Sequence, residues 1–182
     1  MRQMVQLIEL GNRKLIIILS FFLRNPTSKN SFTDLHKKVK IAKGTLAKHL
    51  DFLLKENFIK VERVGLNKLY ALNRENTIVK QLKILNNLLA LNQIKAIGEK
   101  YQIEVYLYGS SSRGEDIEMS DIDLLIIGRI NKEKIVSYIN DISKQINREI
   151  KIVIFTPLEW SNISKKDPAF YERVEKDKIR LC

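Results

Sequence analysis

The most constraining feature of the sequence is a Gly-Ser pair that ten residues separate from an Asp-x-Asp motif. Gly109 and Ser110 directly follow the apolar segment 104–108 (EVYLY), and Asp121 and Asp123 open a second apolar segment, DIDLLII. Alternate side chains of an extended chain share one face, so both aspartates point the same way from the second strand. The spacing indicates a strand, a Gly-Ser turn and a second strand that begins with two carboxylates.

This arrangement predicts a site for a divalent cation and for phosphate groups. Mg²⁺ prefers oxygen ligands and is usually held by one or two carboxylates together with substrate phosphates, so Asp121 and Asp123 are candidate metal ligands. Gly109 permits close approach of a triphosphate, and Ser110, with N–H groups at the start of the following helix, can bind phosphate oxygens. Gly109 and Ser110 are therefore candidate nucleotide-binding residues.

Strands alternate with helices in the C-terminal part of the chain, which predicts a small α/β domain with a mixed sheet over residues 100–182. The expected elements are strands 104–108, 121–127 and 150–155, a helix 132–146, helical pieces 157–165 and 168–177, and an edge strand 179–181.

The N-terminal part, residues 1–76, reads as three helices followed by a β-hairpin. Pro26 ends the first helix, Thr33 is the expected N-cap of the second, and leucines at helical spacing mark the third. The expected elements are helices 7–23, 31–39 and 42–57, and strands 58–64 and 69–73 around a Gly/Asn turn. With the C-terminal domain, this predicts an α/β protein that is α+β overall.

Residues 77–99 are expected to link the two domains, with one long amphipathic helix over 77–98. Ile78, Leu82, Leu85 and Leu89 form its predicted apolar side. Two interpretations stay open, a core helix of the second domain or the seam of a homodimer.

The positive charge is concentrated in the N-terminal part. Residues 1–76 hold 15 Lys and Arg against 6 Asp and Glu, whereas residues 77–182 hold 17 against 15. Such asymmetry is expected of a module that binds phosphate backbones, although acidic lipids or proteins would also attract it.

The sequence contains one cysteine, Cys182, which excludes an internal disulfide framework and a multi-cysteine zinc site and favours a reducing, cytoplasmic environment. The longest apolar run, residues 15–23, is too short to span a membrane. We therefore expect no membrane association.

Residues 32–73 resemble the winged helix-turn-helix domain of ArsR-type and MarR-type regulators, through a Gly-Thr-Leu-x-Lys-His-Leu stretch, a Phe-Ile-x-Val strand and a Lys-Leu-Tyr-x-Leu-Asn return strand. The resemblance implies a recognition helix in the major groove of DNA and a wing on the phosphates. A winged helix used only for protein contact is the alternative. The DNA-binding candidates are Lys43, Thr45, Lys48 and His49 of the third helix and Lys60, Arg63 and Lys68 of the hairpin.

The segment 107–125, with its Gly-Ser pair and its Ser-Asp-Ile-Asp-Leu-Leu run, resembles the minimal nucleotidyltransferases of the polymerase-β-like superfamily. The resemblance implies transfer of a nucleoside monophosphate from an NTP, ATP in the first instance, onto a hydroxyl, with Mg²⁺ ions bound by Asp121 and Asp123. Gly109 and Ser110 would hold the triphosphate. Arg113 would offset charge on it or, alternatively, serve as an exposed structural arginine.

One position departs from the family pattern. The third carboxylate of the superfamily aligns best with Lys151, which cannot bind a metal ion while charged. Glu149 lies two residues earlier on the same strand face and is the candidate replacement, provided that the strand begins early enough.

Three functions follow as hypotheses. The first is a Mg²⁺-dependent nucleotidyltransferase that modifies a macromolecule, with a protein toxin as the partner that the family's toxin–antitoxin pairs suggest. The second is a DNA-binding transcription regulator whose nucleotidyltransferase-like domain serves as a sensor or dimerisation module. The third is an antitoxin that acts by contact alone.

Overall fold

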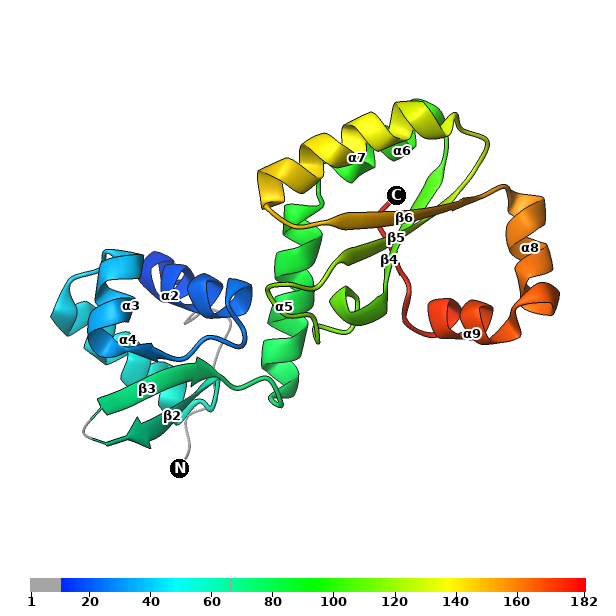
Figure 1. Cartoon of the computed structure of the whole chain (residues 1–182). Coiled ribbons are helices and arrows are strands. Elements are labelled where there is room, and N and C mark those ends of the chain that lie inside the picture. Colours follow the sequence, from blue (N-terminus) through cyan, green and yellow to red (C-terminus); the bar gives the residue numbers. More distant parts are fainter. Residues whose placement is uncertain (1–10, 66) are drawn as a thin grey trace. The chain divides into compact units, whose positions relative to one another are not determined.

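A computed structural model describes residues 11–65 and 67–182 of the chain (Figure 1). The chain divides into two compact units, Met1–Leu82 and Lys83–Cys182. None of the helices in the described ranges is long and apolar enough to cross a membrane.

The first unit combines helices with a small antiparallel sheet whose strand order is β1-β3-β2. Its core is formed by apolar side chains that recur at helical spacing on α2 and α4, together with Leu35 and Phe58. Residues 7–10 of the expected first helix lie outside the described residues. The elements are α2 (Arg13–Arg24), β1 (Asn30–Ser31), α3 (Phe32–Val39), α4 (Lys43–Lys55), β2 (Ile59–Val64) and β3 (Asn67–Leu72).

Helix α3 begins two residues earlier than its expected N-cap implies. Ser31 has an extended backbone, and its hydroxyl accepts a hydrogen bond from the Asp34 N–H at 3.2 Å. The Asp34 carboxylate in turn accepts from the Ser31 N–H at 3.3 Å, which completes a capping box. The prediction that Thr33 caps this helix is therefore wrong, because Ser31 already satisfies the first exposed N–H groups.

The expected single helix over 77–98 is two helices, α5 (Thr77–Ala90) and α6 (Ile94–Tyr101). The chain turns between them, and both Leu91 and Ile94 are buried in the second unit. The turn between the two helices therefore lies within the core of the second unit.

The expected apolar side of α5 is also largely wrong. Ile78, Leu85 and Leu89 are 51%, 50% and 67% exposed, whereas Lys83 and Asn87 are buried. The two polar side chains are buried because both donate hydrogen bonds to the carboxylate of Asp116, which is distant in sequence.

The second unit is built on a four-stranded mixed sheet of order β6-β5-β4-β7. Strands β5 and β6 are parallel and α7 connects them, whereas the other two pairs are antiparallel. The prediction of a mixed α/β fold is confirmed. The remaining elements are β4 (Glu104–Tyr108), η1 (Gly109–Ser111), β5 (Ile122–Ile127), α7 (Lys132–Ile146), β6 (Ile150–Phe155), α8 (Pro157–Lys166), α9 (Pro168–Asp177) and β7 (Ile179–Arg180).

Helices cover both faces of this sheet (Figure 1). Alternate residues of β5 with even numbers pack with α6 and α7, whereas Leu125 and Ile127 pack with Trp160 of α8 and Val174 of α9. Because side chains alternate along a strand, Asp123 lies on the face that α8 and α9 cover.

Candidate active site

The candidate site lies at one end of the sheet, where three neighbouring strands bring polar groups to the same level. Asp123 on β5 is paired in register with Tyr108, the last residue of β4, and with Lys151 on β6. Partners in register have side chains on the same face, so Asp123 and Lys151 lie side by side. The last residue of β4 leads directly into the Gly109 turn.

Gly109 lies against the Asp123 carboxylate. Its φ is +77°, and a Cβ atom at this position would lie 2.6 Å from Oδ2 of Asp123. Any other residue would therefore both strain the backbone and collide with the carboxylate. Glycine is required here for the approach of this side chain, whereas the sequence suggested the approach of a phosphate.

Asp121 immediately precedes β5 and forms an ion pair with the Lys151 ammonium. The two aspartates and this lysine therefore form one charged cluster. Hydrogen bonding to Asp121 and the charge of that carboxylate raise the pKa of Lys151, which keeps its ammonium charged. Burial and the neighbouring charge of Asp121 raise the pKa of Asp123, and Lys151 and Arg173 oppose this effect.

Residues 91–181 match the family described as "Nucleotidyltransferase domain", and this segment is half of the chain. The chain belongs to this nucleotidyltransferase family. Membership supports nucleotidyl transfer as the general reaction and implies an NTP substrate and usually a divalent metal. No curated protein matches the chain.

Glu149 lies directly before β6, two residues before Lys151, and its charge is among those that act on the Lys151 ammonium. Strand β6 begins at Ile150, and Glu149 is exposed, with its backbone carbonyl accepting a hydrogen bond from the Ile122 N–H at 2.9 Å. Within residues 11–65 and 67–182, no three His, Cys, Asp or Glu side chains form a group that would hold a metal ion. The residue in register with Asp123 is Lys151.

Arg113 is engaged within the protein. Its Nε donates to Glu115 Oε2 at 2.9 Å, and its Nη1 donates to Asp177 Oδ2 of α9 at 3.1 Å. These contacts tie the loop after η1 to α9 and favour the structural interpretation of this arginine.

Arg173 of α9 is a residue that the sequence did not single out. Its guanidinium lies over the ring of Phe170 at 5.5 Å, and Phe170 in turn meets the Tyr108 ring edge-on at 6.2 Å. The positive charge of Arg173 counteracts the effects that raise the pKa values of Asp123 and Tyr108. No local signal distinguishes Arg173 from other helix-surface arginines, because its importance comes from the packing of α9 beside the site.

The predicted DNA-binding residues lie in the first unit on α4, β2 and β3. Lys43 and Lys48 are exposed, whereas Thr45 and His49 are half-buried because they flank the buried leucines of α4. Burial, followed by the charge of Lys48, lowers the pKa of His49. The three cations of the hairpin, Lys60, Arg63 and Lys68, are all exposed, and Arg63 and Lys68 are partners in register.

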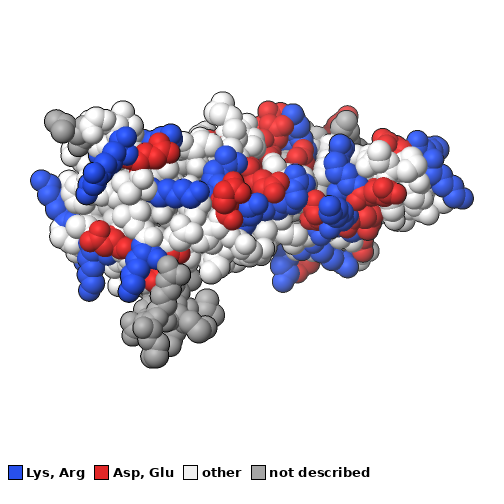
Figure 2. Space-filling view, turned by 90° about the horizontal axis from the view of Figure 1, so that it is seen from below, with Lys and Arg blue, Asp and Glu red and all other residues white. Residues whose placement is uncertain are grey.

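On the face shown in Figure 2, Lys and Arg side chains are scattered among uncharged residues over the first unit, with a few acidic side chains between them. Over the second unit the two signs are closely intermixed. This distribution agrees with the excess of basic residues in the first 76 positions.

Proposed function

We propose that the protein transfers a nucleoside monophosphate from an NTP, ATP in the first instance, onto a hydroxyl of a macromolecule, with Asp121 and Asp123 binding Mg²⁺. The observation that carries this proposal is the cluster of Asp121 and Asp123 beside the Gly109 turn, within a domain of the nucleotidyltransferase family. The family match supports the class of reaction, and the cluster supports the assignment of Asp121 and Asp123 as the residues that bind the metal ion.

The charges of the site fit a bound cation. Burial and Asp121 raise the pKa of Asp123, which means that its charged form is poorly compensated in the protein alone. A divalent cation relieves such a pair, and Mg²⁺ requires only one or two protein carboxylates when phosphates complete its shell. When bound, the ion would polarise phosphate oxygens and offset the charge that develops on them.

Lys151 limits how many cations the cluster accepts. Asp121, Asp123 and Lys151 together carry one net negative charge, whereas three carboxylates would carry three. We therefore propose that the protein residues hold one Mg²⁺ ion and that the Lys151 ammonium takes the place of a second metal ion. This is a departure from the two-metal arrangement that the family resemblance implies.

The transfer itself would follow ordinary phosphoryl chemistry. The acceptor oxygen forms a bond to the α-phosphorus, the bond from that phosphorus to the bridging oxygen breaks, and pyrophosphate leaves while the hydroxyl proton passes to solvent. Gly109 and Ser110 would face the triphosphate, and we assign the neutralisation of its charge to Arg173 in place of Arg113, since Arg113 is paired with Glu115 and Asp177.

The test uses the full chain, α-labelled ATP and Mg²⁺, with candidate acceptor proteins added. Labelled adducts are expected with the wild type and lost in Asp121→Asn. Glu133→Gln is the matched acid-to-amide control and should retain transfer, because Glu133 is exposed in the first turn of α7, which follows the opposite end of β5 from Asp121. Absence of transfer and of Mn²⁺–ATP binding in the wild type would refute the proposal.

DNA binding by the first unit is a second proposal. It is supported by exposed cations on α4 and on the hairpin and by the helix–helix–helix–hairpin order, which resembles a winged helix-turn-helix. The measurement is binding to the DNA upstream of the gene as a function of salt. A salt-insensitive interaction would contradict it, because phosphate contacts release counterions.

The acceptor and the oligomeric state are further proposals. A toxin-like protein as acceptor rests on the family resemblance, and its test is adduct formation on the product of a neighbouring gene.

A homodimer is favoured by the exposed Ile78, Leu85 and Leu89 of α5. Sedimentation of the wild type and of Leu85→Lys measures it, and a monomeric wild type would exclude it.

A further inference from the structure

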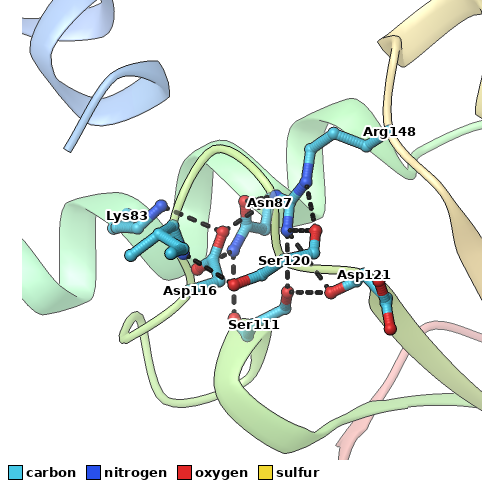
Figure 3. A network of polar contacts seen from close by, with 8 residues as sticks. Lys83, Asn87, Ser111, Asp116, Ser120, Asp121 and Arg148 are labelled. Atoms are coloured by element: carbon cyan, nitrogen blue, oxygen red, sulfur yellow. Dashed lines mark hydrogen bonds and ion pairs between the residues drawn. The ribbon is translucent and has the colours of Figure 1, made fainter. Parts of the chain in front are cut away.

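A buried ionic network lies next to the candidate active site and is centred on Asp116 (Figure 3). The Asp116 side chain has no exposed surface. Its Oδ2 accepts from Lys83 Nζ at 3.0 Å and from Arg148 Nη1 at 2.8 Å, and its Oδ1 accepts from Asn87 Nδ2 at 3.0 Å. A buried carboxylate requires such donors, since an unpaired one would be strongly destabilising.

Arg148 extends this network to the backbone that carries Asp121. Its Nε and Nη2 donate to the Ser120 carbonyl at 3.1 and 2.8 Å, and its Nη2 also reaches the Asp121 carbonyl at 3.4 Å and Ser111 Oγ at 3.4 Å. The guanidinium is planar and carries five N–H donors in a fixed fork. These contacts therefore restrict the orientation of the carbonyl groups that it binds, in addition to supplying a positive charge. Figure 3 shows Arg148 reaching from its own segment towards Asp116, Ser120 and Asp121.

Arg148 is itself held in place by the end of helix α7. The helix ends at Ile146, its C-cap Asn147 has a φ of +52°, and the Arg148 N–H donates to the Ser143 carbonyl at 3.2 Å. The Ser143 hydroxyl donates back to the Arg148 carbonyl at 2.6 Å. The backbone of Arg148 is therefore fixed at the end of α7. From there its guanidinium contacts both α5 and the loop that precedes β5.

The network contains more than the charge of Asp116 requires. Lys83 and Asn87, both buried on α5, already supply a cation and a neutral donor to that carboxylate. Burial lowers the pKa of Lys83, and the attraction of Asp116 opposes this effect, so the pair is mutually dependent. The contacts of Arg148 to the Ser120 and Asp121 carbonyls add no further neutralisation of Asp116, and their effect is to fix the two residues directly before β5.

We propose that Arg148 and Asp116 are positioning residues that hold the segment 111–121 and thereby set where the Asp121 carboxylate lies in the cation site. Lys83 and Asn87 act with them by keeping Asp116 charged and oriented. This inference rests on the proposed function in one respect only, namely that Asp121 binds the cation.

The test compares Arg148→Lys with Arg180→Lys in the full chain. Lysine at position 148 lacks the fork that reaches both carbonyls. It keeps the positive charge beside Asp116, so we expect folding to be preserved. Asp116→Ala is less suitable because it would remove the buried carboxylate that Lys83 binds. Arg180→Lys makes the same change in a surface pair with Glu104, where Nη2 and Oε1 are 3.2 Å apart.

Two measurements are made on each variant. The first is hydrogen exchange of the peptide spanning 111–121, and the second is the affinity for Mn²⁺ in the presence of the non-transferable analogue α,β-methylene-ATP. In Arg148→Lys we expect exchange at least about tenfold faster in this segment and Mn²⁺ affinity about 10- to 100-fold weaker, as for other residues that orient metal ligands. Arg180→Lys should change neither quantity.

The outcomes separate the two proposals. Unchanged exchange in Arg148→Lys would overturn the positioning role whatever the site binds. Faster exchange with unchanged Mn²⁺ affinity would overturn the effect on Asp121. Faster exchange in a protein whose wild type binds no Mn²⁺ would support the hold on the segment and refute the proposed function instead.

Discussion

Gly109 and Asp123 approach each other more closely than a side chain at position 109 would allow. The conformation of the turn and the position of the carboxylate are therefore determined together, because the strand register places Asp123 opposite Tyr108, next to Gly109. Burial and Asp121 raise the pKa of Asp123, whereas Lys151 and Arg173 lower it. At the scale of single residues, the site depends on one glycine and on this balance of charges.

Gly109→Ala tests the first of these dependences. The alanine Cβ would lie 2.6 Å from Oδ2 of Asp123 at a backbone φ of +77°, so we expect a loss of about 1–2 kcal/mol in unfolding free energy and weaker Mn²⁺–ATP binding. Chemical denaturation measures the first effect and Mn²⁺ titration the second. Gly44→Ala, where nothing lies within 4 Å of the added Cβ, is the control and should not destabilise.

Asp123→Asn tests the charge balance through pH. Because burial and Asp121 raise the native pKa of Asp123, the native state retains its proton after the unfolded state has lost it, and stability falls as pH rises from the unfolded value of 3.8 through the native pKa. At neutral pH, Asp123→Asn should therefore be more stable than the wild type, by less than about 1 kcal/mol since solvent screens a partly exposed group. Urea denaturation at neutral pH and near pH 3.8 measures the difference, and a gain that persists at the lower pH would contradict this origin.

Lys151→Glu tests the role of the lysine as a built-in cation. The glutamate would stand in register with Asp123 and add a third carboxylate, so Mn²⁺ stoichiometry in the presence of the ATP analogue should rise from one to two per chain. Electron paramagnetic resonance titration counts the bound ions. Lys151→Gln removes the charge without adding a ligand, and a second ion in that variant would contradict the assignment.

Helix boundaries show what local sequence resolves and what it does not. Helix α7 and strands β4 and β6 have the bounds that the pattern of apolar residues predicts, because α7 packs one regular face against the sheet and both strands are covered by helices on their two faces. Helix α5 departs from that rule. Its buried positions include Lys83 and Asn87, which a pattern of apolar residues assigns to solvent. The reason is Asp116, whose carboxylate meets these side chains only after the chain has folded.

The N-terminus of α3 provides a prediction at the scale of one element. Ser31→Ala removes the hydroxyl that accepts from the Asp34 N–H, and we expect a loss of about 1 kcal/mol in unfolding free energy. Thr33→Ala, the N-cap that sequence alone suggested, should cost much less. Thermal or chemical unfolding of the two variants decides between the positions, and equal losses would contradict the observed capping box.

At the scale of the whole molecule, the chain divides between Leu82 and Lys83, within helix α5. Val79 of this helix belongs to the core of the first unit, whereas Leu88 packs against the core of the second. The basic excess lies almost entirely in the first 76 residues, so the proposed contact with phosphate backbones belongs to the first unit and the proposed transfer to the second.

The salt dependence of DNA binding is a prediction at this scale. Neutralising two cations of the hairpin in Lys60→Gln/Arg63→Gln should reduce the slope of log K against log salt by about 1.8, since each lost phosphate contact accounts for about 0.9. Lys165→Gln/Lys166→Gln makes the same change of charge on exposed residues at the end of α8 and should leave the slope unchanged. Fluorescence anisotropy at several salt concentrations measures the slope for each double variant. Equal slopes in the two variants would show that the hairpin does not contact the DNA.

By itself the sequence determined the order of most elements, the mixed sheet and the strand that carries Asp123 directly after Asp121, because these features follow from the period of apolar residues and from short motifs. Tertiary structure decided the partners of the site. It paired Asp121 with Lys151, engaged Arg113 with Asp177 and joined Lys83 and Arg148 to Asp116 of the segment 111–121. These ion pairs join residues 30 or more positions apart, and a local pattern holds no information on which distant charges meet when a sheet and its helices pack together.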